Sequence, residues 1–213
     1  MTMEKLLVAI PVYDSIRPEF VQSLLALEQR LQRDGIRYEV KIIAGTLVYM
    51  ARDNLAKHAV NNGFSHVLWL DCDMVFGDGI LDDLMTCGKD VVCGRFISRH
   101  SPYLSTLFSS LDPVMRQDDF PDDPFRIAGC GFACVLTSVQ ALRDVLFSTH
   151  GQCFVPTPRL SEDLAFCERV RKLGYEIWCE PTARVGHVGT LTIWPEDGEK
   201  LRKDILGIEG MVI

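Results

Sequence analysis

The chain has 213 residues, of which 47% are hydrophobic and 24% are charged, and its formal net charge is −7. This length and composition predict one globular domain whose core is large enough to need no disulfide or metal to hold it together. The acidic balance disfavours non-specific binding to nucleic acids or anionic membranes. No apolar run approaches the roughly 20 residues of a membrane helix, so we expect no stable membrane insertion.

The eight cysteines are scattered and mostly lie within apolar segments. Cys130 and Cys134 lack a second Cys or His pair at the spacing of a zinc site. Small buried thiols in a reducing compartment explain this pattern best. The amino terminus leads directly into an apolar segment without the features of a signal peptide, so we expect a cytoplasmic location.

Strands and helices alternate in the first half of the chain. The segment 18–34 has apolar residues at helical spacing, including Phe20, Leu24, Leu27 and Leu31, and Gly35 follows it. Short apolar runs between the helical segments read as buried strands. The predicted strands are 6–12, 38–43, 67–71 and 91–96, and the predicted helices are 18–34, 52–62 and 80–86.

The second half is less regular. Ser138 and Ser161 are expected to cap helices over 138–146 and 161–173. Residues 112–124 contain three prolines and five aspartates, which predicts an exposed loop. The other elements predicted here are strands at 103–108, 133–136 and 175–179, an extended piece at 185–188 and a polar helix at 196–205. The whole pattern predicts an α/β fold with a mostly parallel central sheet flanked by helices.

Asp71 and Asp73 follow the apolar run 66–70, at the expected carboxyl end of a buried strand. Open α/β sheets bind ligands at this edge. Alternate residues of an extended strand point the same way, so both carboxylates are expected to face one site. Two such carboxylates suit a divalent cation, and a divalent cation suits a diphosphate. A solvated turn after the strand is the alternative.

Other candidate donor-binding residues follow the first strand and begin the second helix. Pro11, Tyr13 and Asp14 could cup a base, with Tyr13 stacking and Asp14 accepting a hydrogen bond, or form a plain turn. Arg52, near Asn54, offers a forked donor for a phosphate or a base edge, or forms an exposed intrahelical pair.

Three later motifs complete the candidate site. Gly129-Cys130-Gly131-Phe132 predicts a tight loop near the substrate or an ordinary turn. Glu162 and Asp163 could carry acid–base chemistry or only stabilise a helix dipole. His187 lies between two glycines and could be a metal ligand or a structural histidine. Trp194 could stack on a sugar or be a partly buried aromatic residue.

Taken together in chain order, these motifs resemble GT-A glycosyltransferases, in particular family-2-like members and small phage-encoded ones. The segments that carry the resemblance are AIPVYD at 9–14, MARDNL at 50–55, HVLWLDCDMVF at 66–76, GCGF at 129–132, SED at 161–163 and VGHVG at 185–189. They cover residues 5 to 189. The chain departs from the usual pattern at 43–46, where an Asp-Asp-Gly-Ser loop is absent, and at the inserted Asp53, which could compete for Arg52.

The resemblance implies a single GT-A-like (Rossmann-like) domain over 1–213, with a nucleotide-sugar-binding half at 1–100 and an acceptor-side half at 101–213. It implies metal-dependent transfer of a sugar from a nucleoside diphosphate sugar to an acceptor hydroxyl. Asp73 and His187 would bind Mn²⁺ (or Mg²⁺), with Asp71 near the ribose or bound to the metal through water. Asp163 would be the base, assisted by Glu162, and Gly131 would approach the sugar.

Two other functions remain open on the sequence: a sugar-phosphate nucleotidyltransferase and a non-catalytic nucleotide-sugar-binding module. The absence of a glycine-rich, basic triphosphate loop near the first strand counts against the nucleotidyltransferase. The donor base and sugar, the acceptor (glycan, protein or nucleic-acid base), the stereochemical outcome, a lid role for 112–124 and homo-oligomer formation are not encoded in these motifs. Arg95 and Arg99 flank the exit of the fourth predicted strand and could neutralise phosphate, but solvated surface arginines are the favoured interpretation.

Overall fold

The structure is a computed structural model that describes residues 3–100 and 102–189. The predicted helix at 196–205 and the candidate sugar-stacking residue Trp194 lie outside the described residues.

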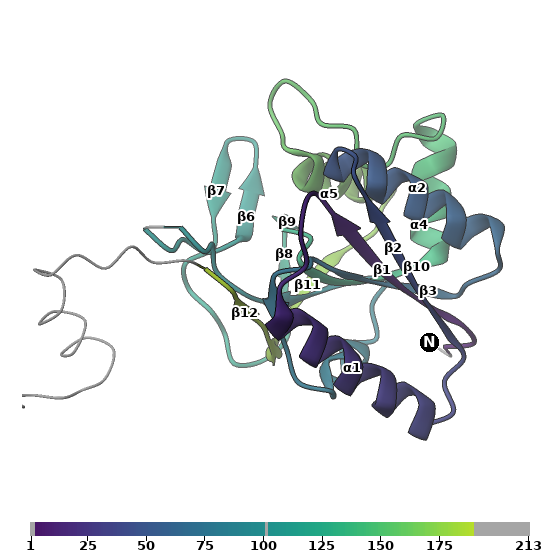
Figure 1. Cartoon of the computed structure of the whole chain (residues 1–213). Coiled ribbons are helices and arrows are strands. Elements are labelled where there is room, and N and C mark those ends of the chain that lie inside the picture. The colour runs from purple at the N-terminus through teal and green to yellow at the C-terminus, as the bar shows by residue number, and fades with distance from the viewer. Residues whose placement is uncertain (1–2, 101, 190–213) are drawn as a thin grey trace, which may run out of the picture.

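A seven-stranded sheet forms the centre of the molecule, in the order β2-β1-β3-β10-β5-β11-β8 (Figure 1). β1 is parallel to β2 and β3, and β5 is parallel to β11, whereas β10 runs antiparallel between β3 and β5 and β8 is antiparallel at the edge. Most strands therefore point the same way, as the sequence predicts. The strands are β1 (Leu6–Val12), β2 (Tyr38–Ala44), β3 (His66–Leu70), β5 (Val91–Arg95), β8 (Phe125–Ile127), β10 (Cys134–Ser138) and β11 (Ile177–Arg184).

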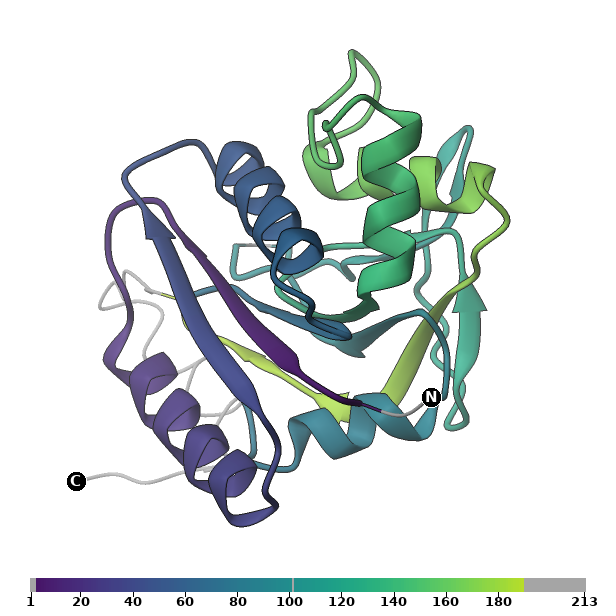
Figure 2. The same cartoon turned by 90° about the vertical axis from the view of Figure 1, so that its right-hand side faces the viewer.

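Helices cover both faces of this sheet (Figure 2). One face carries α1 (Pro18–Arg33) and α3 (Ile80–Thr86), and the other carries α2 (Val48–Asn61), α4 (Val139–Ser148) and α5 (Glu162–Lys172). All seven residues of β1 and all five of β3 are buried. A strand covered on both faces must be apolar throughout, which explains the continuous hydrophobic runs in the sequence.

Two small sheets extend the carboxyl side of the central sheet. β6 (Leu107–Leu111) pairs with β7 (Val114–Arg116) and β9 (Gly129–Cys130), and β4 (Met74–Val75) pairs with β12 (Gly186–His187). The second pairing sets His187 opposite Met74, the residue after Asp73. This short sheet therefore brings the late histidine to the end of β3.

Several predicted elements differ from the structure. The segment 112–124 is not only a loop, because β7 lies within it and pairs with β6. The strand expected at 103–108 begins later, at Leu107. α2 begins at Val48, four residues before the predicted start, after a cap residue, Leu47, with no side-chain bond to signal it. Ser138 caps α4 through a bond from the Ala141 amide, but Ser161 makes no such bond at α5.

The cysteines match the pattern that the sequence predicts. All eight cysteines are free, and six of them are buried. Within the residues described, no helix combines the length and apolarity that crossing a membrane requires.

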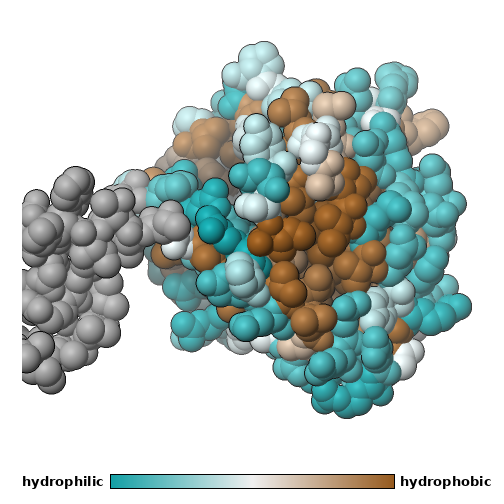
Figure 3. All heavy atoms as spheres, in the orientation of Figure 1, coloured by the Kyte–Doolittle hydropathy of each residue, from teal (hydrophilic) through white to brown (hydrophobic). Residues whose placement is uncertain are grey.

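Figure 3 shows an apolar area amid hydrophilic residues on one face, where Figure 1 places β1 and β2. The edge strand β2 exposes Ile42.

Candidate functional site

A pocket of about 300 Å³ opens at the carboxyl ends of β1 and β3. Its position follows from the parallel sheet, because the carboxyl ends of β1 and β3 lie at the same edge. Five of the predicted residues line it, namely Pro11, Tyr13, Asp14, Asp71 and Asp73, together with Ser15, Arg17, Val48, Cys72 and Arg99. All of these residues come from the first 100 of the chain.

Tyr13 separates this pocket from a second hollow that Gly45, Thr46 and Leu47 complete. The Tyr13 side chain is among the most exposed large hydrophobic residues, with 67% of its surface accessible. An aromatic ring so exposed between two hollows can stack on a planar ligand. The 45–47 loop thus lies beside Tyr13 even though it lacks the acidic residues that the resemblance would place there.

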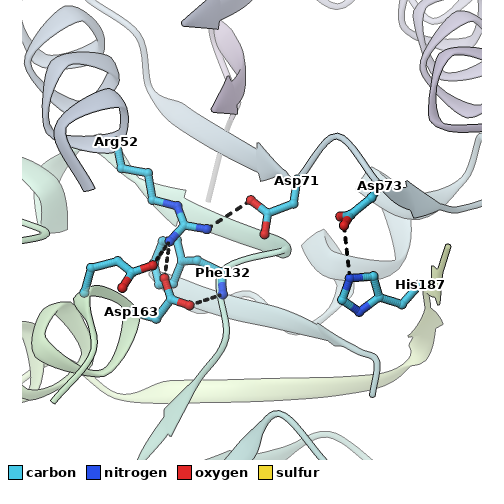
Figure 4. A network of polar contacts seen from close by, with 7 residues as sticks. Arg52, Asp71, Asp73, Phe132, Asp163 and His187 are labelled. Atoms are coloured by element: carbon cyan, nitrogen blue, oxygen red, sulfur yellow. Dashed lines mark hydrogen bonds and ion pairs between the residues drawn. The ribbon is translucent and has the colours of Figure 1, made fainter. Parts of the chain in front are cut away.

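Asp71 and Asp73 both line the pocket, in agreement with the prediction that they face one site, but their carboxylates contact different side chains. β3 ends at Leu70, so residues 71–73 form a turn in which the alternation of side chains no longer applies. Asp71 Oδ1 accepts a hydrogen bond from Arg52 at 3.0 Å, whereas Asp73 faces His187 (Figure 4). Arg99 also contacts the Asp73 carboxylate. Both carboxylates therefore line one pocket, as expected, but each has its own protein partners.

His187 has a fixed orientation toward Asp73. Its Nδ1 lies 3.0 Å from the carbonyl oxygen of Ile97, and a carbonyl can only accept, so Nδ1 carries the proton. Nε2 lies 3.3 Å from Asp73 Oδ2. When the imidazole is neutral, a lone pair on Nε2 and a carboxylate oxygen face each other. Such a pair of acceptors needs a cation or a proton between them.

The protonation of this pair follows from its charges. Burial opposes ionisation of Asp73, but the hydrogen bond and charge of His187, together with Arg99, lower the pKa of Asp73. Burial likewise disfavours a charged His187, but its bonds to Asp73 and Ile97 raise the pKa of the imidazole. Arg99 contacts the same Asp73 oxygen that faces Nε2. Asp73 therefore contacts two side chains that can carry positive charge, Arg99 and His187.

The donor set at Asp73 and His187 suits a divalent metal. A carboxylate oxygen and an imidazole nitrogen together favour Mn²⁺ over Mg²⁺, because nitrogen is the softer donor. The described part of the chain holds no group of three or more acidic, His or Cys side chains placed to bind one ion. Two protein ligands are nevertheless enough where phosphate oxygens and water supply the others. The residues present thus fit a metal that binds together with a diphosphate.

Arg52 lies at the centre of a second polar cluster (Figure 4). Its side chain is only 2% exposed, and its guanidinium contacts Asp71 at 3.0 Å, Glu162 at 3.4 Å and Asp163. Burial alone would lower the pKa of Arg52, but the three carboxylates raise it. Within residues 3–100 and 102–189, the Arg52 Nε is a buried atom with no hydrogen-bond partner. The carboxylates, contacted by the two terminal nitrogens, therefore orient this guanidinium.

Asp163 is held from two sides. One oxygen contacts Arg52, and the other accepts a hydrogen bond of 3.3 Å from the Phe132 amide, in the loop that follows β9. Burial raises the pKa of Asp163 to about 7, Arg52 acts against this, and the nearby charge of Glu162 adds to it. A carboxylate with such a pKa can accept a proton near neutral pH.

The glycine-rich loop owes its path to close contacts. A Cβ at Gly129 would lie 3.1 Å from Leu164 Cδ2 on α5, and one at Gly131 would lie 3.1 Å from Phe96 Cζ. Both distances are tighter than ordinary packing contacts, so a side chain at either position would require the loop, Leu164 or Phe96 to shift by a few tenths of an ångström. The two glycines therefore keep the Phe132 amide within reach of Asp163.

Two other candidate donor residues, Arg52 and Asn54, do not line this pocket. The Arg52 guanidinium contacts the carboxylates of Asp71, Glu162 and Asp163, and Asn54 is exposed. Asp53 does not compete for Arg52, because it accepts a hydrogen bond of 2.8 Å from the Phe154 amide.

Two residues of the pocket were not expected from the sequence. Arg99, read there as a solvated arginine, contacts Asp73 and lines the pocket. Arg17 lines it from the residue before α1. No motif surrounds either arginine, so only the folded chain reveals them.

No known protein family matches this sequence, and a search of curated proteins finds no relative. Solved structures do resemble it. A197 from STIV superposes with a TM-score of 0.53 at 15% identity, over 90% of this chain and 97% of that one. The glycosyltransferase GalNAc-T7, solved with UDP, GalNAc and Mn²⁺, superposes with a TM-score of 0.50 at 11% identity. The chain has a GT-A-like fold.

The match to GalNAc-T7 covers 90% of this chain but only 45% of that protein, so the chain spans less than half of its length. A197 is nearly covered in full. At these identities the likeness concerns the GT-A-like fold alone. The chemistry of this chain has to be argued from its own pocket and its own two polar clusters.

Proposed function

We propose that this protein is a metal-dependent glycosyltransferase, which moves a sugar from a nucleoside diphosphate sugar to an acceptor hydroxyl. One observation carries the proposal. The pocket that holds Tyr13, Asp14 and Asp73 opens beside a buried Arg52 that contacts both Asp71 and Asp163. A pocket of about 300 Å³, a pair of side chains suited to a metal and a carboxylate with a raised pKa are thus connected through Asp71 and Arg52.

On the donor side, Tyr13 is proposed to stack on the base and Asp14 to accept a hydrogen bond from the base or ribose. Both line the pocket, and Tyr13 also lines the hollow at 45–47. Asp71, which is side-chain bonded to Arg52, would face the ribose from the floor of the pocket. Since all these residues precede residue 101, they support a nucleotide-binding half over 1–100.

Asp73 and His187 are proposed to hold Mn²⁺, or Mg²⁺, together with the diphosphate of the donor. When bound, such a metal offsets negative charge on the leaving diphosphate. Arg99 contacts Asp73 from the rim and can donate to the same phosphate oxygens. GalNAc-T7 was solved with UDP and Mn²⁺, which is consistent with this assignment.

On the acceptor side, Asp163 is proposed to take the proton of the attacking hydroxyl. The bond from the anomeric carbon to the diphosphate oxygen breaks, and its electron pair leaves with the diphosphate. The acceptor oxygen forms the new bond to carbon and its proton passes to Asp163. Glu162 is proposed to assist by sharing Arg52 with Asp163, and Gly131 to approach the reacting sugar through its backbone.

We place this reaction in a reducing compartment such as the cytoplasm. All eight cysteines are free, and buried free thiols are typical of proteins that work under reducing conditions.

A thermal-shift panel of nucleoside diphosphates and their sugars, each with and without Mn²⁺, tests the donor site. We expect one base series to raise the melting temperature by about 4 °C or more at saturating ligand, in the presence of Mn²⁺ only. Asp73→Ala should abolish this shift, while Asp118→Ala, a change at an exposed acid outside the pocket, should keep it. No shift with any nucleotide in the folded protein would contradict the proposal.

A further inference from the structure

A second groove, of about 770 Å³, lies on the acceptor side of the sheet edge. Its walls come from the carboxyl ends of β5 and β11, and Arg95 and Arg184 both line it. Neither arginine has a role in the donor site. Both are exposed, and within the described residues neither side chain makes an ion pair or a hydrogen bond.

The two arginines are neighbours because of an irregularity in β11. From Cys179 to Arg184 the strand advances five residues, while β5 advances only two, from Cys93 to Arg95. Without this bulge Pro181 would stand opposite Arg95. Bulges next to active sites commonly re-aim a side chain, and this one sets Arg184 directly against Arg95.

Close backbone packing keeps the two strands together at this point. A Cβ at Gly94 would lie 2.7 Å from the Ala183 carbonyl oxygen, so no larger residue fits there. The Arg95 guanidinium lies 4.2 Å from the centre of the Phe120 ring, which restricts its motion. Like charges on paired strand positions destabilise a sheet. Two arginines at paired strand positions that line one groove favour an anion there, because an anion would offset their mutual repulsion.

The groove continues from the proposed transfer site. It shares Ile97, Val185 and Gly186 with a hollow of about 430 Å³ beside His187, and that hollow shares Arg99 with the donor pocket. Phe96 lines the groove and packs edge-on against the His187 ring, with 6.3 Å between the two ring centres. A molecule in the groove can therefore extend toward the proposed metal site.

We propose that this groove binds an anionic group of the acceptor, a phosphate monoester or a carboxylate, between Arg95 and Arg184. The anion site itself does not depend on the proposed glycosyl transfer. Only the identification of the bound molecule as the acceptor rests on that function. Asp122 also lines the groove and is its one acidic side chain among the described residues, so the local charge stays positive. Two forked guanidinium groups suit the paired oxygens of such anions.

Calorimetric titration of the full chain with glucose 6-phosphate, glucuronate and glucose tests this subsite. We expect at least one of the two charged sugars to bind and glucose to bind more than about tenfold more weakly, since a charge-assisted hydrogen bond contributes that much. The double change Arg95→Gln and Arg184→Gln should abolish the difference between charged and neutral sugars. Arg143→Gln, at an exposed arginine of α4, should preserve it.

Tighter binding of glucose 6-phosphate would identify the anionic group as a phosphate. Tighter binding of glucuronate would identify it as a carboxylate. Equal binding of all three sugars, or charge-dependent binding that survives the double change, would overturn the assignment. These titrations contain no nucleotide, so their outcome does not depend on the donor site. If nucleotides fail to bind but the charged sugar binds through these arginines, the transferase proposal fails and the anion subsite stands.

Discussion

The guanidinium of Arg52 contacts the carboxylate of Asp163, which lies 111 residues further along the chain. The same guanidinium bonds Asp71 at the end of β3. One buried arginine on α2 thus joins the strand end that carries the proposed donor site to the helix that carries the proposed base. We infer that Arg52 positions both carboxylates instead of contacting the donor phosphate.

Replacing Arg52 by methionine should destabilise the fold, because three partly buried carboxylates would lose their shared cation. We expect a decrease of about 3–5 kcal/mol in the free energy of unfolding, as when one partner of a buried ion pair is removed. Urea unfolding of the variant and the unchanged protein measures this difference in the free energy of unfolding. Arg143→Met, at an exposed site, should change stability by less than about 0.5 kcal/mol. An Arg52→Met protein as stable as this control would rule out the positioning role.

Asp163→Asn should remove catalysis and leave donor binding in place. The amide cannot accept the hydroxyl proton, so turnover should fall by about 10²–10⁴-fold. The nucleotide-induced thermal shift should be unchanged, because Asp163 does not line the donor pocket. Glu162→Gln, the same kind of change at the adjacent residue, is the control and should retain much more activity than Asp163→Asn. Turnover near the wild-type rate in Asp163→Asn would show that another group takes the proton.

The rate should depend on pH through Asp163. Burial raises the pKa of this carboxyl to about 7, and a base is active only when it has lost its proton. The rate constant kcat/KM should therefore rise with pH and level off above about 7. Glu162→Gln removes a negative charge that raises this pKa, so the rising limb should move to lower pH. A limb that does not move in Glu162→Gln would assign the titration to a different group.

His187→Ala should weaken Mn²⁺ binding by at least about tenfold, since one of two protein ligands is lost. The Mn²⁺-dependent thermal shift with nucleotide reports it. His150→Asn serves as the control, because His150 does not line the pocket and its backbone has a φ of 52°, which asparagine tolerates. Equal Mn²⁺ dependence in His187→Ala and in the control would exclude His187 as a ligand.

Tyr13→Ala should lower nucleotide affinity, whereas Tyr13→Phe should keep it, because stacking requires the ring and not the hydroxyl. Loss of an aromatic stacking partner costs about 1–3 kcal/mol, which raises the dissociation constant by about 5- to 140-fold. Titration of the preferred nucleoside diphosphate with Mn²⁺ measures the change. Equal affinity in the alanine and phenylalanine variants would show that the base binds away from Tyr13.

Local features of the chain were predictable from the sequence. The buried strand β1 and the helix α3 have the predicted bounds, because apolar runs and helical spacing are properties of short segments. The pocket residues at the ends of β1 and β3 were also predictable, since parallel strands put their carboxyl ends at one edge.

Features that depend on distant contacts were not predictable. The central antiparallel strand β10 takes its place from pairing with β3 and β5, which no local pattern encodes. The divergence of Asp71 and Asp73 depends on where β3 ends and on Arg52 and His187 reaching them from elsewhere. The opposed Arg95 and Arg184 depend on a bulge within β11.

The most direct test of the proposed transferase is to incubate the full chain with nucleoside diphosphate sugars, Mn²⁺ and a mixture of neutral and charged sugar acceptors, and to measure release of nucleoside diphosphate. We predict release from one base series, lost on chelation of the metal and in Asp73→Ala, and retained in Asp118→Ala. Absence of release from every donor, or release of pyrophosphate from a nucleoside triphosphate and a sugar phosphate, would contradict it.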